Sequence, residues 1–141
     1  MTDVIRLLDL REEPLSVDEV HQAVADPAAG GVALFVGVVR DHDHGRDVGA
    51  LGYSAHPTAL DAMRTVAHGV VDRHDVLALA AVHRVGDLAV GDLAVVVGVA
   101  CRHRGEAFAA CAMMIDDLKA QTPIWKHQQF SDGTEEWVGT P

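Results

Sequence analysis

Apolar and polar positions recur along the chain with two periods, one typical of β-strands and one of α-helices. Runs of alternating or continuous apolar residues predict strands at residues 3–10, 31–40, 50–56, 76–86, 92–101, 124–130 and 135–138. Apolar residues three or four positions apart predict helices at residues 16–26, 57–75 and 105–121. This order of elements predicts an α+β fold, in which three helices pack on a mixed or largely antiparallel sheet. We expect a single domain over residues 1–141.

Residues at the ends of these segments support the assignment. Ser16 and Glu19 form a capping box at the start of the first helix, and Pro123 ends the third. Residues 131–134 carry the turn residues of a β-hairpin. The strand at 31–40 is almost wholly apolar, so we expect both of its faces to be covered. The polar segment 41–49 predicts a loop.

The charge of the protein limits what it binds. The formal net charge is −10, and a field of this sign repels nucleic acid and anionic lipid surfaces. An anionic ligand therefore needs a local cationic pocket. No apolar run is long enough to span a membrane, and the N-terminal residues lack the pattern of a signal peptide. Cys101 and Cys111 lie in apolar segments without a CxxC pattern, so we expect two buried thiols in a cytoplasmic protein.

Lysine is almost absent from the chain. Of the 11 lysines and arginines, only Lys119 and Lys126 are lysines. Lys119 lies within about 20° of the centre of an apolar stripe on the third helix, formed by Phe108, Cys111, Ala112 and Ile115. A lysine at a helix end commonly buries its methylenes and extends its ammonium group to water. Two amines close together in an apolar site instead lower each other's pKa, and either can then act as acid, base or nucleophile.

Other cationic side chains lie where predicted strands end. Arg40 ends the strand at 31–40, and His103 and Arg104 lie between a strand and the third helix. Free backbone N–H groups at a helix start, together with arginine and histidine, suit a phosphate or carboxylate. The alternative is a solvated basic turn that balances an acidic protein. We expect both lysines to lie beside these three residues in one positively charged hollow.

The segment Asp41–His44 alternates carboxylate and imidazole side chains, which can bind a metal ion. Neighbouring residues of an extended loop point in opposite directions, and this spacing matches no closed structural site, so we prefer a solvated loop. The other histidines are scattered, and we expect them to be structural or exposed: His21, His56, His68, His74 and His83. No P-loop, GxGxxG, HExxH or nucleophile-elbow pattern is present.

Three stretches occur in order over most of the chain: GGVALFVGVVRDH, AVHRVGDLAVGDLAVVVGVACRHRGEAF and MIDDLKAQTPIWKH. With them the chain resembles the large, catalytic subunit of molybdopterin synthase from about residue 30 to residue 130. One such stretch alone is a weak signal. Three of them in order and at matching separations are specific to this family.

The resemblance implies an α/β-hammerhead-like fold and a sulfurtransferase. Two sulfurs pass from the C-terminal Gly-Gly thiocarboxylate of a small ubiquitin-like subunit to cyclic pyranopterin monophosphate, forming the dithiolene of molybdopterin. The resemblance also implies a homodimer with a small subunit at each end, and neither a cofactor nor a metal. The family's essential lysines fall on Lys119 and Lys126, and its anion-binding residues on Arg40, His103 and Arg104. We expect Lys119 to meet the thiocarboxylate and transfer protons, and Lys126 to stabilise the pterin intermediate.

The chain departs from the family pattern in three places. Gln128 stands where a glutamate is common, and the segment Tyr53–His56 lacks a carboxylate that relatives often carry. The sequence also stops soon after Trp137, where relatives often continue toward the neighbouring subunit's pocket. Two other functions are alternatives: a non-catalytic dimeric binding module for a ubiquitin-like protein, and a phosphate-handling metalloenzyme that uses residues 41–44.

Overall fold

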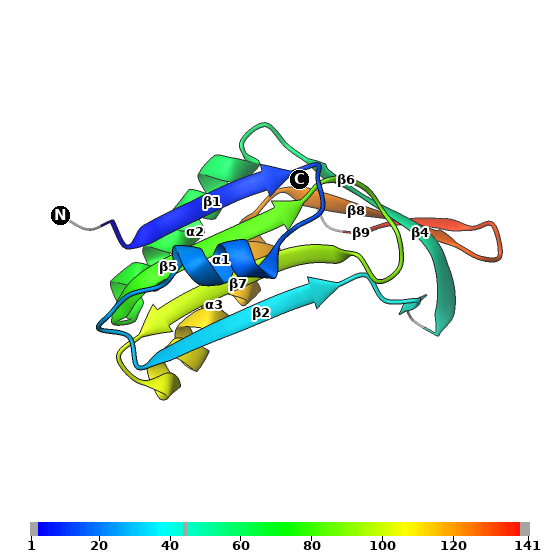
Figure 1. Ribbon diagram of the computed structural model, residues 1–141. Coiled ribbons are helices and arrows are strands. Elements are labelled where there is room, and N and C mark those ends of the chain that lie inside the picture. Colours follow the sequence, from blue (N-terminus) through cyan, green and yellow to red (C-terminus); the bar gives the residue numbers. More distant parts are fainter. Residues whose placement is uncertain (1–2, 44, 139–141) are drawn as a thin grey trace.

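The computed structural model describes residues 3–43 and 45–138 (Figure 1). The elements follow in the order β1 (Ile5–Arg11), α1 (Val17–Ala23), β2 (Gly31–Val38), β3 (His42–Asp43), β4 (Arg46–Ala55), α2 (Ala59–Arg73), β5 (Val76–Arg84), β6 (Gly86–Leu88), β7 (Leu93–Cys101), α3 (Arg104–Gln121), β8 (Ile124–Phe130) and β9 (Glu135–Val138). The predicted α+β class with three helices is confirmed, although the strands form two sheets.

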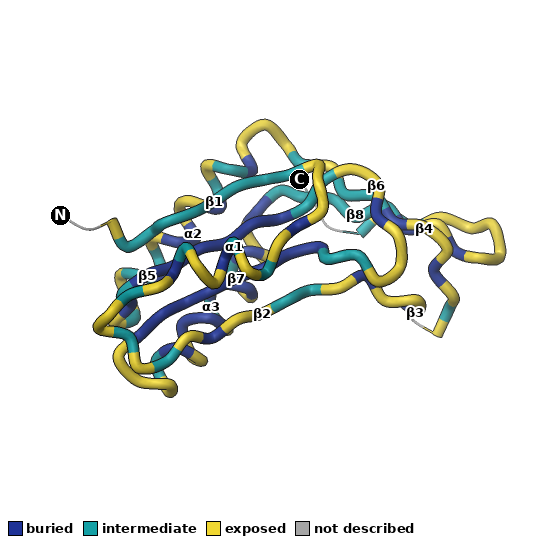
Figure 2. The backbone as a smooth tube through the Cα atoms, in the orientation of Figure 1, coloured by how far each residue is buried: buried dark blue, intermediate teal, exposed yellow. Residues whose placement is uncertain are grey.

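The first sheet has the strand order β1-β5-β7-β2, in which β1 runs parallel to β5 and the other pairs are antiparallel. Helix α1 lies on one face, and α2 and α3 lie on the other (Figure 1). The two central strands, β5 and β7, are therefore covered on both sides and form the buried middle of the molecule (Figure 2). Cys101 and Cys111 are buried free thiols, as expected, and burial raises the pKa of both.

Strand β2 is the edge of this sheet, and its burial differs from the expectation. Its side chains Val32, Leu34, Phe35 and Val38 are exposed. Along its length β2 pairs with β7 alone among the described strands, so the prediction that both faces are covered was wrong for a single chain. A contiguous exposed apolar surface of this kind is typical of a site where a partner binds.

The second sheet has the order β3-β4-β8-β9, with β6 paired to β4. It extends from the end of the first sheet where β5 and β2 end and where β7 begins (Figure 1). Residues 41–49 were expected to form a loop. Instead they contain β3 and the first part of β4, because the backbone of this segment pairs with itself in a hairpin whose second strand continues along β8. The predicted strands at 124–130 and 135–138 are confirmed.

Candidate active site

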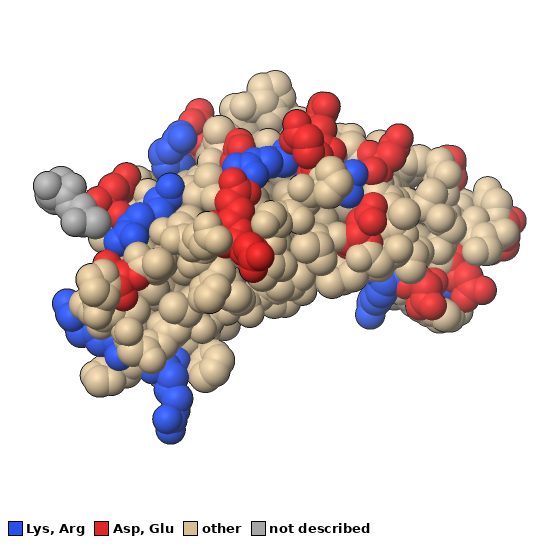
Figure 3. All heavy atoms as spheres, in the orientation of Figure 1, with Lys and Arg blue, Asp and Glu red and all other residues tan. Residues whose placement is uncertain are grey.

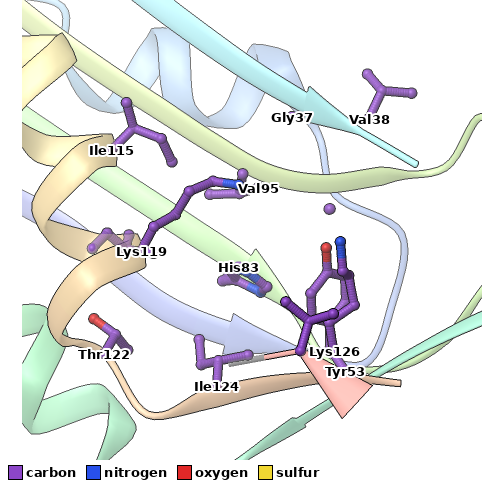
Figure 4. Close-up of a pocket in the computed structure, with 13 residues that line it drawn as sticks. Gly37, Val38, Tyr53, His83, Val95, Ile115, Lys119, Thr122, Ile124 and Lys126 are labelled. Carbon is purple, nitrogen blue, oxygen red and sulfur yellow. The ribbon is translucent and has the colours of Figure 1, made fainter. Parts of the chain in front are cut away.

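A cavity of about 240 Å³ opens where the end of α3 meets both sheets (Figure 4). Its walls come from the first sheet, the second sheet and the helix. The residues that line it are Gly37, Val38, Tyr53, His83, Ala94, Val95, Ile115, Leu118, Lys119, Thr122, Ile124, Lys126 and Val138. Most of these side chains are apolar, so the polar groups among them carry the chemistry of the site.

Lys119 and Lys126 line this cavity together, which is the arrangement expected of them. Lys119 lies in the last turn of α3, where the helix dipole favours a cation. It follows Ile115 by one helical turn, and Figure 4 shows its side chain extending from the helix across the cavity. The apolar stripe predicted for this helix is only partly buried, because Phe108 is 65% exposed whereas Ile115 is 9% exposed.

Lys126 enters the cavity from the opposite side, on β8. It pairs with Tyr53 across the β4–β8 ladder, so both side chains leave the sheet on one face. Burial lowers the pKa of the Lys126 ammonium, the Asp43 carboxylate raises it, and the charges of Lys119 and Arg40 lower it further. The predicted mutual effect of the two lysines is thus present at Lys126. A lysine with a lowered pKa gives up its proton more readily at neutral pH.

His83 lies on the floor of the same cavity (Figure 4) and was not assigned to the site from the sequence. Its Nδ1 lies 2.7 Å from the carbonyl oxygen of Arg84, so Nδ1 carries the proton and Nε2 is left as an acceptor. Burial lowers the pKa of His83 to about 4. Its ring contacts Tyr53 edge-on, with the centroids 4.9 Å apart. The imidazole is therefore neutral at physiological pH. The sequence carried one signal for this assignment, a histidine near the end of an otherwise apolar strand.

Thr122 adds an aliphatic hydroxyl group to the cavity wall. The residue is 7% exposed, and its Oγ1 has no hydrogen-bond partner among the described residues. A buried hydroxyl without a partner is uncommon in folded proteins. Its place on the wall leaves it free to bond a group that enters the cavity.

None of the three predicted anion-binding residues lines this cavity. Arg40 follows β2, and its charge acts on Lys126. His103 is the N-cap of α3 and Arg104 is its first residue. Lys119 is fifteen residues further along this helix, which corresponds to about 22 Å of helix axis. The structure thus brings the charge of Arg40 near Lys126 but separates His103 and Arg104 from Lys119 within one chain.

The segment Asp41–His44 does not form a common ligand set among its described residues. The His42 ring lies between Asp41 and Asp47, at 2.7 Å and 2.8 Å from their carboxylates, and its pKa is raised mainly by the hydrogen bond to Asp41. Asp43 turns inward and is buried. Among the residues described, no group of three His, Cys, Asp or Glu side chains is placed to hold a metal ion. His44 lies outside the described residues.

Comparison with known proteins places the chain in a family. Residues 10–121 match the family model described as MoaE protein. This chain belongs to the MoaE family. It is 45% identical over 131 residues to molybdopterin synthase catalytic subunit 1 of Mycobacterium tuberculosis, with 92% of this chain and 88% of that protein covered.

Solved structures of the family share the fold. A molybdopterin synthase structure from Staphylococcus aureus superposes with a TM-score of 0.85 at 27% identity, covering 92% of this chain and 95% of that one. A structure from Helicobacter pylori is described as a protein–protein complex of subunits 1 and 2 of molybdopterin-converting factor. It superposes with a TM-score of 0.73 at 22% identity, covering 95% and 93% of the two chains.

The residues at the departures from the family pattern lie in or beside the second sheet. Gln128 is buried and donates a hydrogen bond from its amide to Asp43. His56 contacts Thr58 at 2.9 Å and lies near Trp125, outside the residues that line the cavity. Trp137 stacks on His127 with 4.4 Å between the ring centroids, and residues 139–141 lie outside the described part of the chain.

In the described part, no helix combines the length and apolar character that a membrane crossing requires.

Proposed function

We propose that this chain is the catalytic subunit of a molybdopterin synthase. It transfers two sulfurs from the C-terminal thiocarboxylate of a small ubiquitin-like subunit to cyclic pyranopterin monophosphate, which forms the dithiolene of molybdopterin. The observation that carries the proposal is the convergence of the chain's only two lysines on one apolar cavity of an acidic protein. We further propose that it works in the cytoplasm.

The two lysines differ in position, and this supports different roles. Both reactants are anions, one a phosphate ester and the other a thiocarboxylate, and the net charge of −10 opposes their approach except where cations are concentrated. Lys119 reaches across the cavity from the helix end and meets the thiocarboxylate, to which it supplies or from which it removes protons. Lys126 is half-buried beside Tyr53 and stabilises negative charge on the pterin intermediate, because a desolvated ammonium interacts more strongly with an anion.

The edge strand β2 supports a homodimer. Residues 31–38 contain no charged side chain, and Figure 3 shows this edge largely without Lys, Arg, Asp or Glu along its middle, with basic side chains near its two ends. A two-fold axis across an edge strand pairs the strand with its own copy in antiparallel orientation. The second copy then covers the apolar side chains that one chain leaves exposed, and the two sheets become continuous.

Such a dimer also accounts for the place of His103 and Arg104. A Cβ at Gly31, the first residue of β2, would lie 3.1 Å from the Cα of Arg104. At the other end of β2, Gly37 lines the cavity together with Lys119. Antiparallel pairing of β2 with its copy sets the first end of one strand beside the last end of the other. In this arrangement each cavity receives His103 and Arg104 from the second copy, where they hold the substrate's phosphate together with Arg40.

A reconstituted reaction tests the proposal. The protein is combined with cyclic pyranopterin monophosphate and a small subunit whose Gly-Gly end carries a thiocarboxylate, and dithiolene formation is measured. We expect Lys119→Ala and Lys126→Ala to lower the rate about 100-fold or more, the size of an acid–base contribution. Lys119→Arg keeps the charge but cannot release a proton, so it separates binding from proton transfer. Arg64→Ala on α2, whose side chain is exposed and pairs with Asp61 one helical turn earlier, is the matched control.

The same assay addresses the alternative function. If the wild-type chain binds the thiocarboxylated subunit but forms no dithiolene, it is a non-catalytic binding module. If both lysine variants retain full turnover, the cavity is not the site of sulfur transfer. A pull-down with mass spectrometry for a bound protein that ends in Gly-Gly identifies the natural small subunit.

A further inference from the structure

His83 on β5 has one paired and one unpaired ring nitrogen. The residue is 7% exposed, and Nδ1 donates a hydrogen bond to the carbonyl oxygen of Arg84 at 2.7 Å. Nε2 makes no hydrogen bond to a described residue. Among these residues, the enclosed side-chain nitrogens and oxygens without a partner are Arg84 Nε, Thr122 Oγ1 and His127 Nε2. Nε2 of His83 is not one of them, so it is open to the cavity that the residue lines.

The unpaired nitrogen is a hydrogen-bond acceptor. Because Nδ1 carries the proton of the neutral ring, Nε2 offers only a lone pair. Among the described residues, no carboxylate that could hold a second proton on the ring lines the cavity, whereas both lysines do. Burial lowers the pKa of His83 to about 4, and the charge of Lys119 acts in the same direction. The ring is therefore neutral at physiological pH.

The ring of His83 is held in place by a second contact. It meets Tyr53 edge-on, with the centroids 4.9 Å apart and 85° between the planes. Figure 4 shows the ring flanked by Lys119 on the helix side and by Tyr53 and Lys126 on the other. The acceptor thus has a fixed place in the space between the two amines.

A structural role accounts for only half of this side chain. An asparagine could also donate to the Arg84 carbonyl, and it would leave no acceptor in the cavity. A buried polar atom without a partner costs free energy. The other polar side chains on the described wall are two ammonium groups, which only donate, and two hydroxyl groups, which can donate. Nε2 is therefore the only side-chain atom of the described wall that accepts and cannot donate.

An acceptor beside two cations selects among anions. Chloride or sulfate can pair with the lysines but leaves Nε2 without a partner, whereas a ligand with an N–H group beside its negative charge satisfies both. Both reactants of the proposed function carry such a group. In the terminal glycine of the small subunit, the amide nitrogen is two bonds from the carbon of the thiocarboxylate, and a pterin carries N–H groups on its rings.

We propose that His83 is a ligand-binding residue, whose Nε2 accepts a hydrogen bond from an N–H group of the molecule held between Lys119 and Lys126. The inference deepens the proposed function and rests on it for the identity of the two reactants. The tail of the small subunit is the favoured source, because its N–H group adjoins the anion that Lys119 is proposed to meet.

Nitrogen NMR reports on this atom directly. In protein labelled with ¹⁵N-histidine, the signals that His83→Asn removes belong to His83. The probes are a peptide that ends in Gly-Gly with a free carboxylate, and its ester analogue, in which oxygen replaces the N–H group of the terminal glycine. We expect the Gly-Gly peptide to move the Nε2 signal toward lower frequency, as for a lone pair that accepts a hydrogen bond, and to leave Nδ1 unmoved. The ester analogue should move neither signal.

Two variants separate the acceptor from the structural hydrogen bond. His83→Asn keeps a donor for the Arg84 carbonyl but removes the acceptor, so we expect it to weaken peptide binding about three- to tenfold, the size of one hydrogen bond. It should also lose the preference of wild type for the peptide over the ester. His83→Gln has a longer side chain that returns an acceptor oxygen to the cavity, so it should recover part of both. His68→Asn, exposed on α2, is the control and should bind like wild type.

Cyclic pyranopterin monophosphate is the second probe and separates the two sources of the N–H group. If it moves the Nε2 signal and binds more weakly to His83→Asn, and the peptide does neither, the donor belongs to the pterin and the binding role stands. The inference is overturned if neither ligand moves Nε2, or if His83→Asn binds both ligands as wild type does. If His83→Asn does not fold, His83→Gln assigns the signals, and the two peptides and the pterin on wild type decide.

Sulfur transfer by the wild-type chain is measured in parallel. Turnover with an Nε2 signal that no ligand moves would reject the inference and leave the proposed function in place. A moved Nε2 signal without any dithiolene formation would reject the proposed function and leave the binding role of His83 in place.

Discussion

Arg104 and Lys119 lie at opposite ends of one helix, with about 22 Å of helix axis between them. Both carry positive charge, and both are proposed to act in one reaction site, Lys119 on the thiocarboxylate and Arg104 on the phosphate of the pterin. A single chain cannot bring them to the same cavity. A two-fold pairing along β2 removes this conflict, because it places the start of one α3 near the end of the other. The helix that separates the two residues within a chain then connects two active sites.

Complementation between defective chains tests this arrangement. In the proposed dimer each cavity takes Lys119 from one chain and Arg104 from the other. Lys119→Ala and Arg104→Ala therefore remove the contributions of different chains to one cavity. In an equimolar mixture of refolded chains about half of the dimers are mixed and each holds one intact cavity, so we expect about a quarter of wild-type sulfur transfer. A mixture of Lys119→Ala and Lys126→Ala is the control, because both residues belong to the same chain's wall and no intact cavity forms. Equal activity in the two mixtures would contradict a shared site.

Charge on the edge strand should separate the dimer. Val32 and Leu34 are both 39% exposed on β2. In an antiparallel two-fold contact a glutamate at Leu34, near the middle of the strand, lies close to its own copy, and one at Val32 adds a charge that the contact must desolvate. We expect Leu34→Glu, and more strongly the double variant with Val32→Glu, to halve the mass in solution to the 15.0 kDa chain. Light scattering after size exclusion measures this. Val90→Glu, a 45% exposed valine in the β6–β7 turn, should leave the dimer intact.

The same separation should abolish sulfur transfer although both lysines remain. The cavity of a monomer keeps Lys119 and Lys126 but receives no His103 and Arg104. A folded monomer with full turnover would show that the second copy contributes nothing to the site, and the substrate-binding role proposed for those two residues would then be withdrawn.

The parts of the site that were predictable from the sequence are those joined by local chain geometry. Lys119 and Lys126 flank a short turn at Pro123, so a helix followed by a strand must bring their ends together. His83 was missed because its strand precedes the lysines by more than thirty residues in the sequence. The pairing of β4 with β8 places Tyr53 opposite Lys126, and the ring of Tyr53 contacts His83, so the connection is made by tertiary contacts.

Two expectations from the sequence differ from the structure, because the contacts that decide them are not made by neighbouring residues in the sequence. The alternation in residues 41–44 suggested either metal ligands or solvated side chains, yet Asp43 is buried against Gln128, 85 positions away in the chain. The apolar run of β2 suggested a strand covered on both faces. The run does form a strand, but the described residues of this chain do not cover its exposed apolar side chains. Hydrophobic pattern predicts that a surface is covered and does not reveal by which molecule.

The neutral state of His83 should make stability depend on pH. Its pKa is about 4 in the folded protein, against an ordinary value of 6.5. Between pH 4 and pH 6.5 the unfolded chain binds a proton at His83 that the folded chain does not. The contribution of the neutral imidazole to the free energy of unfolding is therefore complete above pH 6.5 and is lost as the pH falls toward 4. The whole effect is on the order of 3 kcal/mol. Urea unfolding of wild type and His83→Asn across this range measures it, and parallel curves would exclude a buried neutral imidazole.

Two glycines should respond to alanine in opposite directions, and the pair tests the packing beside the start of β2. A Cβ at Gly30 would lie 2.2 Å from the carbonyl oxygen of Arg102, a backbone atom that cannot turn aside. We expect Gly30→Ala to destabilise the protein by about 1–3 kcal/mol and to displace the adjoining start of α3, which lowers the affinity for phosphate through Arg104. Gly69, within α2, has open space at its Cβ position, so Gly69→Ala should stabilise by up to about 1 kcal/mol. Thermal denaturation of both variants, with phosphate titration of the dimer, measures these effects. A Gly30→Ala protein as stable as wild type would mean that β2 and α3 are not in close contact at this end.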